Sequence, residues 1–231
     1  MYIRITLLLS ALFFTACVPT SMAILPGLET NSTKYKITEK PGLFSGNKIV
    51  FSPYSATNIS RSWVSSTNSG MKIGSTKINN KNSSQDYTYQ FNGKNSWNGD
   101  CEVNQESSKI GIFSGGLSYN LSCTFSPIES KDNSLSSWQF SFKGESPSTS
   151  TATINLKSKT IIVKAINKMQ GSSIKLGQNT GYYFYSDEKI IAGVDALSNE
   201  GPVWLNNNLS EDEKDTIGMV IAALLLNQTN Q

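Results

Sequence analysis

The chain has 231 residues, a formal net charge of +3, three cysteines and no histidine. The absence of histidine excludes Ser-His-Asp and Cys-His catalysis, imidazole general bases and nearly all zinc or copper sites. Lysines are scattered through the sequence and no glycine-rich phosphate loop occurs, so nothing indicates a nucleic acid or a nucleotide as partner. Abundant Ser, Asn, Gly and Thr, with only 16% charged residues, favour a β-rich fold with many turns.

The first 16 residues have the three parts of a secretory signal peptide. Arg4 supplies the cation, an apolar run extends from Leu7 to Phe14 with one interruption at Ser10, and small residues precede Cys17. The apolar run is shorter than the roughly 20 residues that cross a bilayer as a helix. We therefore expect residues 1–16 to be a cleaved signal and not a permanent membrane span.

Residues 14–17, with the sequence FTAC, resemble the lipobox of bacterial lipoproteins, in which the cysteine sulfur is lipidated and becomes the new N-terminus. The resemblance implies a lipid on Cys17, and two or three acyl chains hold a protein stably on a membrane. Val18 follows in place of an aspartate, which by the same resemblance implies the outer membrane and its periplasmic face. The alternative is an ordinary signal peptide cut after Ala23, with Cys17 discarded.

Residues 17–33 are expected to form a lipidated tether, and residues 34–231 a single β-rich domain. Alternation of apolar and polar side chains is clearest at 87–91, 119–125 and 138–142. Further short strands are expected at 34–39, 48–52, 62–65, 71–78, 110–113, 151–156, 160–166, 181–185 and 189–194. Turn residues separate them at 68–70, 92–93, 98–99, 115–116, 144–147 and 199–202. About a dozen short strands predict a barrel or a sandwich.

Two cysteines remain if Cys17 carries lipid. Cys123 lies in an alternating run, and Cys101 alternates with Trp97 and Val103, so both side chains are expected to point inward. Because disulfides persist outside the cytoplasm, we predict one bond between Cys101 and Cys123. Closing a loop of about 23 residues stabilises a fold by roughly 3 kcal/mol. Two free buried thiols are the alternative.

The C-terminal segment predicts a helix over 210–227. Ser210 can cap it, Glu213 can complete a capping box, and three acids precede the positive end of the helix dipole. Residues 217–226 (IGMVIAALLL) are apolar on every side, so the helix must be enclosed by protein or lipid. At about 15 Å the apolar run is half a bilayer thick, which favours a core helix inside a β shell.

The tail of the chain contains GYYFYSDEKIIAGV at 181–194 and PVWL at 202–205, followed by the helix. This arrangement resembles the tubby, scramblase and LURP-one superfamily, in which a barrel closes around a hydrophobic C-terminal helix. The resemblance covers about 50 residues and is architectural, so it carries over no functional residue. The fold class that we predict is mainly β, an antiparallel barrel or sandwich of about twelve strands with one buried C-terminal helix.

A few residue types could still support chemistry or binding. Carboxylates that could pair as a glycosidase acid and nucleophile are Asp86, Asp100, Glu102, Asp187, Glu188 and Asp195. The S-x-x-K spacing occurs at Ser45/Lys48, Ser69/Lys72, Ser172/Lys175 and Ser186/Lys189, outside expected helices. Tryptophans that could line an apolar or sugar-binding groove are Trp63, Trp97, Trp138 and Trp204. Solvated turn acids, chance spacing and core packing are the interpretations that we favour for these residues.

The sequence therefore favours a non-enzymatic envelope lipoprotein that binds a lipid or a protein partner as an accessory domain. Its expected contacts are the membrane through the lipid on Cys17 and an envelope protein or lipid ligand, with no cofactor, metal or nucleic acid. One alternative is a carboxylate-dependent hydrolase that acts on cell-wall glycan. Another is a purely structural surface lipoprotein.

Overall fold

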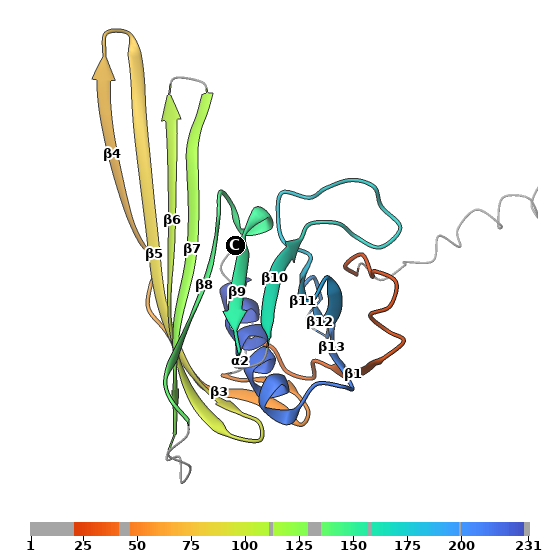
Figure 1. Cartoon of the computed structure of the whole chain (residues 1–231). Coiled ribbons are helices and arrows are strands. Elements are labelled where there is room, and N and C mark those ends of the chain that lie inside the picture. The colour runs from red at the N-terminus through yellow and green to blue at the C-terminus, as the bar shows by residue number, and fades with distance from the viewer. Residues whose placement is uncertain are drawn as a thin grey trace, which may run out of the picture.

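The computed structural model describes residues 21–41, 47–110, 113–128, 135–156, 159–198 and 200–228. The expected signal peptide at 1–16 and the lipidation site at Cys17 lie outside these residues. Figure 1 shows antiparallel strands that form a nearly closed barrel around one helix, α2 (Glu211–Gln228). The predicted fold class is confirmed, and of its two forms the barrel is the one observed.

Neighbouring strands along the chain are mostly neighbours in the sheet. Twelve strands follow the order β1-β13-β12-β11-β10-β9-β8-β7-β6-β5-β3-β2, and β4 pairs with β5 beside this path. The strands are β1 (Ser32–Lys36), β2 (Ile49–Phe51), β3 (Tyr54–Arg61), β4 (Ser65–Ile73), β5 (Thr76–Asn92), β6 (Ser96–Ile110), β7 (Phe113–Pro127), β8 (Trp138–Gly144), β9 (Thr151–Asn155), β10 (Thr160–Ile166), β11 (Gly181–Ser186), β12 (Lys189–Asp195) and β13 (Pro202–Asn206). A short 3-10 helix, η2 (Pro147–Thr149), joins β8 to β9.

The barrel closes where the residues that follow β1 pair with β2. The amide of Val50 donates to the carbonyl oxygen of Glu39 at 3.0 Å, and the amide of Thr38 donates to that of Val50 at 2.9 Å. These two bonds join the ends of the sheet. Closure matters because an open edge leaves backbone groups unpaired and invites aggregation.

Helix α2 fills the inside of the barrel. Ile217 and every residue from 219 to 226 are at most 1% exposed, as expected for a helix that is apolar on all sides. Two buried tyrosines of β5 hold its backbone: the hydroxyl of Tyr87 donates to the carbonyl oxygen of Ala223 at 2.8 Å, and that of Tyr89 to Met219 at 2.6 Å. The predicted core helix is therefore confirmed, and both tyrosines fix its position along the barrel axis.

The C-terminal end of α2 lies where β3 ends. The guanidinium of Arg61, the last residue of β3, donates to the carbonyl oxygen of Leu226 at 3.2 Å. The side-chain amide of Asn227 donates to the hydroxyl of Tyr119 in β7. A cation near the last carbonyl groups is favourable because the helix dipole is negative there.

The chain from residue 21 to β1 is packed against the outside of the barrel. Met22 and Leu28 are fully buried and form a small second core with Tyr183 and Trp204. The amide of Ala23 donates to the carbonyl oxygen of Lys168 at 2.9 Å. The described part of the expected tether at 17–33 therefore belongs to the folded domain, and β1 begins at Ser32.

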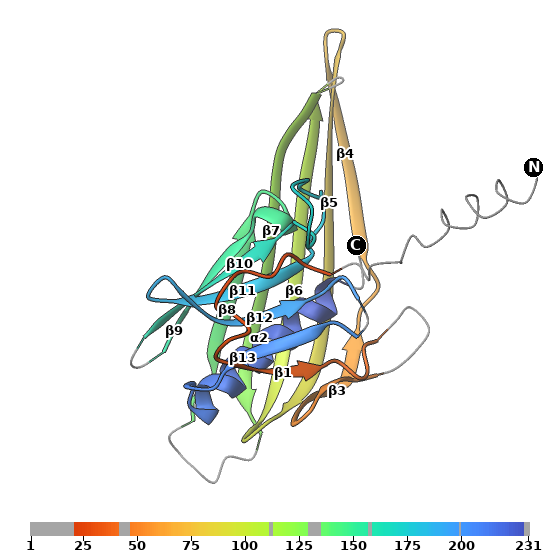
Figure 2. The ribbon, with the colours of Figure 1, turned by 90° about the vertical axis from the view of Figure 1, so that its right-hand side faces the viewer.

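Four strands continue far beyond the barrel as a flat sheet (Figures 1 and 2). We call this extension the arm, and define it as residues 65–85, 103–110 and 113–118 of β4, β5, β6 and β7. All of β4 is exposed, and no residue of β5 before Tyr87 is buried. The arm therefore has no core of its own, and where its side chains are described both faces meet solvent.

Several expected boundaries in the arm are wrong. The strand expected at 71–78 is interrupted by the turn at Gly74 and Ser75, and the strand expected at 110–113 runs from the last residue of β6 to the first residue of β7. The turns expected at 68–70 and 115–116 instead lie inside β4 and β7. Outside the arm, the turn expected at 98–99 lies inside β6, where Gly99 is buried. The physical reason in the arm is that strand pairing satisfies the backbone of these Ser, Asn and Gly residues although no alternating apolar pattern marks them in the sequence.

Candidate functional site

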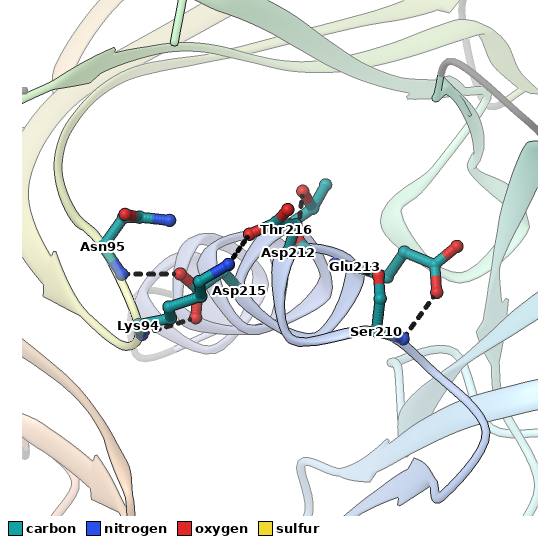
Figure 3. A network of polar contacts seen from close by, with 7 residues as sticks. All are labelled: Lys94, Asn95, Ser210, Asp212, Glu213, Asp215 and Thr216. Carbon is teal, nitrogen blue, oxygen red and sulfur yellow. Dashed lines mark hydrogen bonds and ion pairs between the residues drawn. The ribbon is translucent and has the colours of Figure 1, made fainter. Parts of the chain in front are cut away.

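The N-terminal end of α2 lies at the end of the barrel opposite the arm. The amide of Ser210 donates to Oε2 of Glu213 at 2.8 Å, and the amide of Glu213 donates to Oγ of Ser210 at 3.3 Å (Figure 3). The predicted capping box is thus confirmed. Nζ of Lys159, which follows β9, lies 2.7 Å from Oε1 of Glu213 and links the helix start to the barrel wall.

Asp215 joins the same end of the helix to the turn between β5 and β6. Its Oδ1 accepts a hydrogen bond from the amide of Lys94 at 2.9 Å, and its Oδ2 accepts one from the amide of Asn95 at 2.8 Å (Figure 3). A Cβ on Gly93 would lie 2.1 Å from Oδ1, so only glycine fits beside the carboxylate. Nζ of Lys94 also lies 2.8 Å from Oδ1 of Asp212.

Burial and hydrogen bonds shift the pKa values of Asp215 and Glu213 in opposite directions. Burial raises the pKa of Asp215 above its ordinary value, and the hydrogen bonds from Asn95 and Lys94 offset this only in part. Burial also acts to raise the pKa of Glu213, but the bonds from Lys159 and Ser210 outweigh it, so this pKa lies below its ordinary value. The surroundings of Glu213 therefore stabilise its charged form, whereas those of Asp215 destabilise its charged form relative to water.

A pocket of about 530 Å³ opens between the first turns of α2 and strands β6, β8 and β9. Trp97, Trp138 and Met219 supply apolar surface, while Gln139 and Asn155 supply amide groups. Trp97 is 6% exposed, and its indole nitrogen is buried without a hydrogen-bond partner. Buried indole N–H groups usually have a partner, so this one calls for an acceptor that the described residues do not provide.

The pocket has the size of a small-molecule site, since ligand pockets are commonly about 300 to 1,000 Å³. Its lining is mixed, because the apolar surface of Trp97, Trp138 and Met219 lies beside polar residues of β8, β9 and the helix start. Such a lining suits an amphiphilic ligand that carries hydrogen-bonding groups. The sequence pattern predicts the inward position of Trp97. It does not reveal that the indole N–H lacks a partner among the described residues, or that Asp215 contacts the turn between β5 and β6.

The structure brings together three of the six candidate acids. Asp86 and Glu102 are directly opposite each other on β5 and β6, and Asp100 lies two residues from Glu102 on the same outer face. All three are exposed. Asp100 and Glu102 line a depression of about 460 Å³ with residues of β7, β8 and β9. This outer depression adjoins the pocket at the helix start, since Gln139 and Thr153 line both.

The other three candidate acids are a buried, hydrogen-bonded aspartate and two residues of an exposed turn. Asp195 is 1% exposed, and its carboxylate accepts hydrogen bonds from the amides of Met22 at 3.0 Å and Leu197 at 2.9 Å. Burial raises the pKa of Asp195 against these bonds. Asp187 and Glu188 form the exposed turn between β11 and β12, with φ of 48° and 64°.

No described S-x-x-K pair lies on a helix. Ser69 and Lys72 lie on β4, where a spacing of three residues places them on opposite faces. Ser186 and Lys189 face each other across the turn between β11 and β12. The remaining pairs are Ser172/Lys175, in the segment between β10 and β11, and Ser45/Lys48, whose serine lies outside the described residues. Among described residues, no three His, Cys, Asp or Glu side chains are close enough to hold a metal ion.

The two remaining tryptophans lie away from the pocket. Trp63 is 96% exposed at the base of the arm, between β3 and β4. Trp204 is buried in the second core, and Nζ of Lys34 lies 5.5 Å from the centre of its ring. Only Trp97 and Trp138 therefore meet at one site, and Phe125 stacks beside Trp138 with 4.4 Å between ring centres.

Cys101 and Cys123 are bonded to each other, with an S–S distance of 2.10 Å. They are direct cross-strand partners on β6 and β7, and both are nearly fully buried. The predicted pairing is the one observed. The bond lies where β6 and β7 leave the barrel for the arm, and so holds the two strands together at that point.

No protein family, curated protein or solved structure matches this chain. Among the residues that the structure describes, no helix is long and apolar enough to cross a membrane. The fold and the pocket geometry are therefore the observations from which a function can be inferred.

Proposed function

We propose that this protein is a non-enzymatic binding domain of a bacterial envelope lipoprotein, held at the membrane by a lipid on Cys17. Its pocket at the start of α2 would receive a small amphiphilic ligand. The observation that carries the proposal is Trp97, which lines the pocket and whose buried indole N–H has no partner among the described residues. A ligand acceptor atom would complete the hydrogen bonding once binding exposes this N–H to the pocket, and the ring of Trp138 would cover the apolar part.

Two of the three carboxylates that line the pocket, Asp215 and Glu213, support binding over catalysis. Both oxygens of Asp215 accept backbone hydrogen bonds, and both oxygens of Glu213 are engaged by Ser210 and Lys159. A general acid or base must be free to reach a substrate proton at hydrogen-bond distance. These acids instead hold the helix start to the barrel, so they shape the pocket.

The pocket is tested by exchanging Trp97 for phenylalanine, which keeps an aromatic ring and removes the donor. We expect lysophosphatidylcholine, a single-chain amphiphile, to shift the indole N–H signal of Trp97 in an NMR titration. An unmatched buried polar group costs about 1 to 3 kcal/mol, so Trp97→Phe should weaken binding by roughly tenfold or more. Trp63→Phe is the matched control, since Trp63 lies outside the pocket. Equal binding by both variants would exclude the proposed site.

A second candidate is hydrolysis of cell-wall glycan at the outer depression. It is favoured by one observation, the juxtaposition of Asp100 and Glu102 on one face of β6. Two residues along a strand span about 6.6 Å, within the range of paired glycosidase carboxyl groups. Cleavage of purified peptidoglycan by the wild type, lost in Asp100→Asn or Glu102→Gln, would establish this activity and displace the binding proposal.

A further inference from the structure

The arm carries an unusual share of the charge of the molecule. It contains four lysines and one glutamate, a formal charge of +3 that equals the charge of the whole chain. The lysines are Lys72, Lys77, Lys81 and Lys109, and all four are exposed. None of them takes part in an ion pair in the described part of the chain. Lysines that look scattered in the sequence therefore gather on one projecting sheet.

Strand register places all four lysines on one face. Lys72 is paired with Lys77 across β4 and β5, and Lys109 is paired with Asn79 across β5 and β6. Lys81 shares this face because it is separated from Lys77 and Asn79 by even numbers of residues. This is the face that, further along β5, becomes the inside of the barrel at Tyr87. We call it the basic face.

The basic face is hollowed between its lysines. A depression of about 530 Å³ is lined by Lys77, Lys81, Lys109 and the polar residues Asn68 and Asn79, among others. Like charges directly opposite each other on a sheet are destabilising, and Lys72 and Lys77 are such a pair. An anionic group in this depression would relieve the repulsion and find amide donors beside the ammonium groups.

The opposite face of the arm is apolar near its tip. Met71 is paired with Ile78, and Ile78 with Ile110, so the three side chains form one row on this face. Met71, Ile73 and Ile110 are 46 to 60% exposed. Six of the nine large hydrophobic side chains exposed in the described residues lie on the arm or at its base, namely Trp63, Val64, Met71, Ile73, Ile110 and Leu117.

The arm and the described start of the chain lie at the same end of the barrel (Figures 1 and 2). Ser21 is held there, because its carbonyl oxygen accepts a hydrogen bond from the amide of Gln170 at 2.9 Å. Four residues of extended chain from Cys17 to Ser21 span at most about 14 Å. By contrast, the eleven residues of β5 before Tyr87 extend about 36 Å. An arm that projected straight at the bilayer would hold Cys17 about 22 Å short of it, so a lipid on Cys17 and the tip of the arm meet one bilayer only when the arm is inclined toward the surface.

We propose that the tip of the arm docks on a bilayer that contains anionic phospholipids, with phosphate headgroups at the basic face and the apolar row in the interfacial layer. The tether argument rests on the proposed lipidation of Cys17, whereas the charge and the apolar row do not. The lysines without ion-pair partners would be attracted to the negatively charged headgroups. The exposed apolar side chains on the opposite face would enter the layer between headgroups and acyl chains. An inclined arm whose tip enters the headgroup layer lets both faces of the thin sheet meet that layer.

The test is co-sedimentation with phosphatidylcholine vesicles, with and without phosphatidylglycerol. The mature chain, residues 17–231, carries Cys17→Ser, so that neither the apolar signal nor a lipid on this cysteine contributes, and failure of the anchor proposal is separate. In one variant Lys77, Lys81 and Lys109 become glutamine. In the matched control Lys143, Lys175 and Lys189, exposed lysines of the barrel portion, become glutamine. A third variant carries Met71→Ser and Ile110→Thr.

We expect binding only to vesicles with phosphatidylglycerol, and weaker binding at high salt. Each lysine near such a surface contributes about fivefold in affinity, so the arm triple variant should bind on the order of a hundredfold more weakly, and the barrel triple variant clearly less so. The apolar variant should also lose binding. Circular dichroism and the melting temperature verify that each variant is folded.

Three results would overturn the whole proposal, and a fourth would overturn the part that concerns the basic face. One is equal binding to vesicles with and without phosphatidylglycerol, and another is the absence of binding to either. The third is a stable dimer in light scattering that the arm variant dissociates, since this would assign the arm to a second copy of the chain. Retained binding by the arm triple variant has the same consequence for the basic face.

Discussion

The dependence of the fold on α2 is open to a quantitative test at Leu224. This side chain is 0% exposed inside the barrel and lies in a helix that is buried on every side. Truncating a fully buried leucine to alanine costs about 2 to 5 kcal/mol, depending on how far the surroundings collapse into the cavity. Collapse is restricted here by a closed sheet around the helix, so we expect the upper half of this range. Typical domains have only about 5 to 15 kcal/mol of net stability.

The assay is thermal and urea unfolding of Leu224→Ala beside Leu117→Ala, a leucine of the arm that is 45% exposed. A loss of 1 kcal/mol lowers the melting temperature by roughly 2 to 4 °C at this size, so Leu224→Ala should lower it by on the order of 10 °C. The control should change it very little. Leu224→Asp, or deletion of everything after Asn208, should prevent folding. An unchanged melting temperature in the truncated chain would refute the enclosed-helix reasoning.

Further predictions concern the contacts around α2. Asp215→Asn should destabilise the fold by about 1 to 3 kcal/mol in urea unfolding, because one amide N–H would face a donor instead of an acceptor. Gly218→Ala should destabilise it by a similar amount, about 1 to 3 kcal/mol, since a Cβ there would lie 2.7 Å from the Phe91 ring. Replacing Cys101 and Cys123 with serine should lower the unfolding free energy by about 3 kcal/mol and make it insensitive to reductant. The raised pKa of Asp215 means that the folded state binds its proton more tightly than the unfolded state. The unfolding free energy should therefore fall as pH rises from about 4 through that pKa, and Asp215→Asn should remove this component from a pH series; an identical pH dependence in both proteins would contradict it.

Strong local patterns predicted the β-rich shell, the enclosed helix and the disulfide correctly, and left open whether the shell is a barrel or a sandwich. The run from Ile217 to Leu226 has no polar side, so burial follows from composition alone. Alternation around Cys101 and Cys123 predicted their shared inward direction, and the structure pairs them across β6 and β7. In both cases the side chains that are buried in the core are also the ones that form the apolar pattern in the sequence.

The arm could not be predicted in the same way, because neither of its faces is buried. Gly74 lies in a turn and Gly70 lies within a strand, yet each stands between a serine and a large apolar residue. Strand pairing decides between them, and pairing is a long-range property. The hydrogen bonds that Asp215 accepts from the turn between β5 and β6 join residues about 120 positions apart. The unused donor of Trp97 is defined by a partner that the described residues lack. Neither feature leaves a local signal in the sequence.

The proposed function is tested most directly by native mass spectrometry of the protein extracted from its own membrane. The expected species begins at Cys17, carries covalent acyl chains and retains a small non-covalent ligand that Trp97→Phe loses and Trp63→Phe keeps. An unmodified chain that begins elsewhere would contradict the lipid anchor, and a wild-type protein without any bound ligand would contradict the binding pocket.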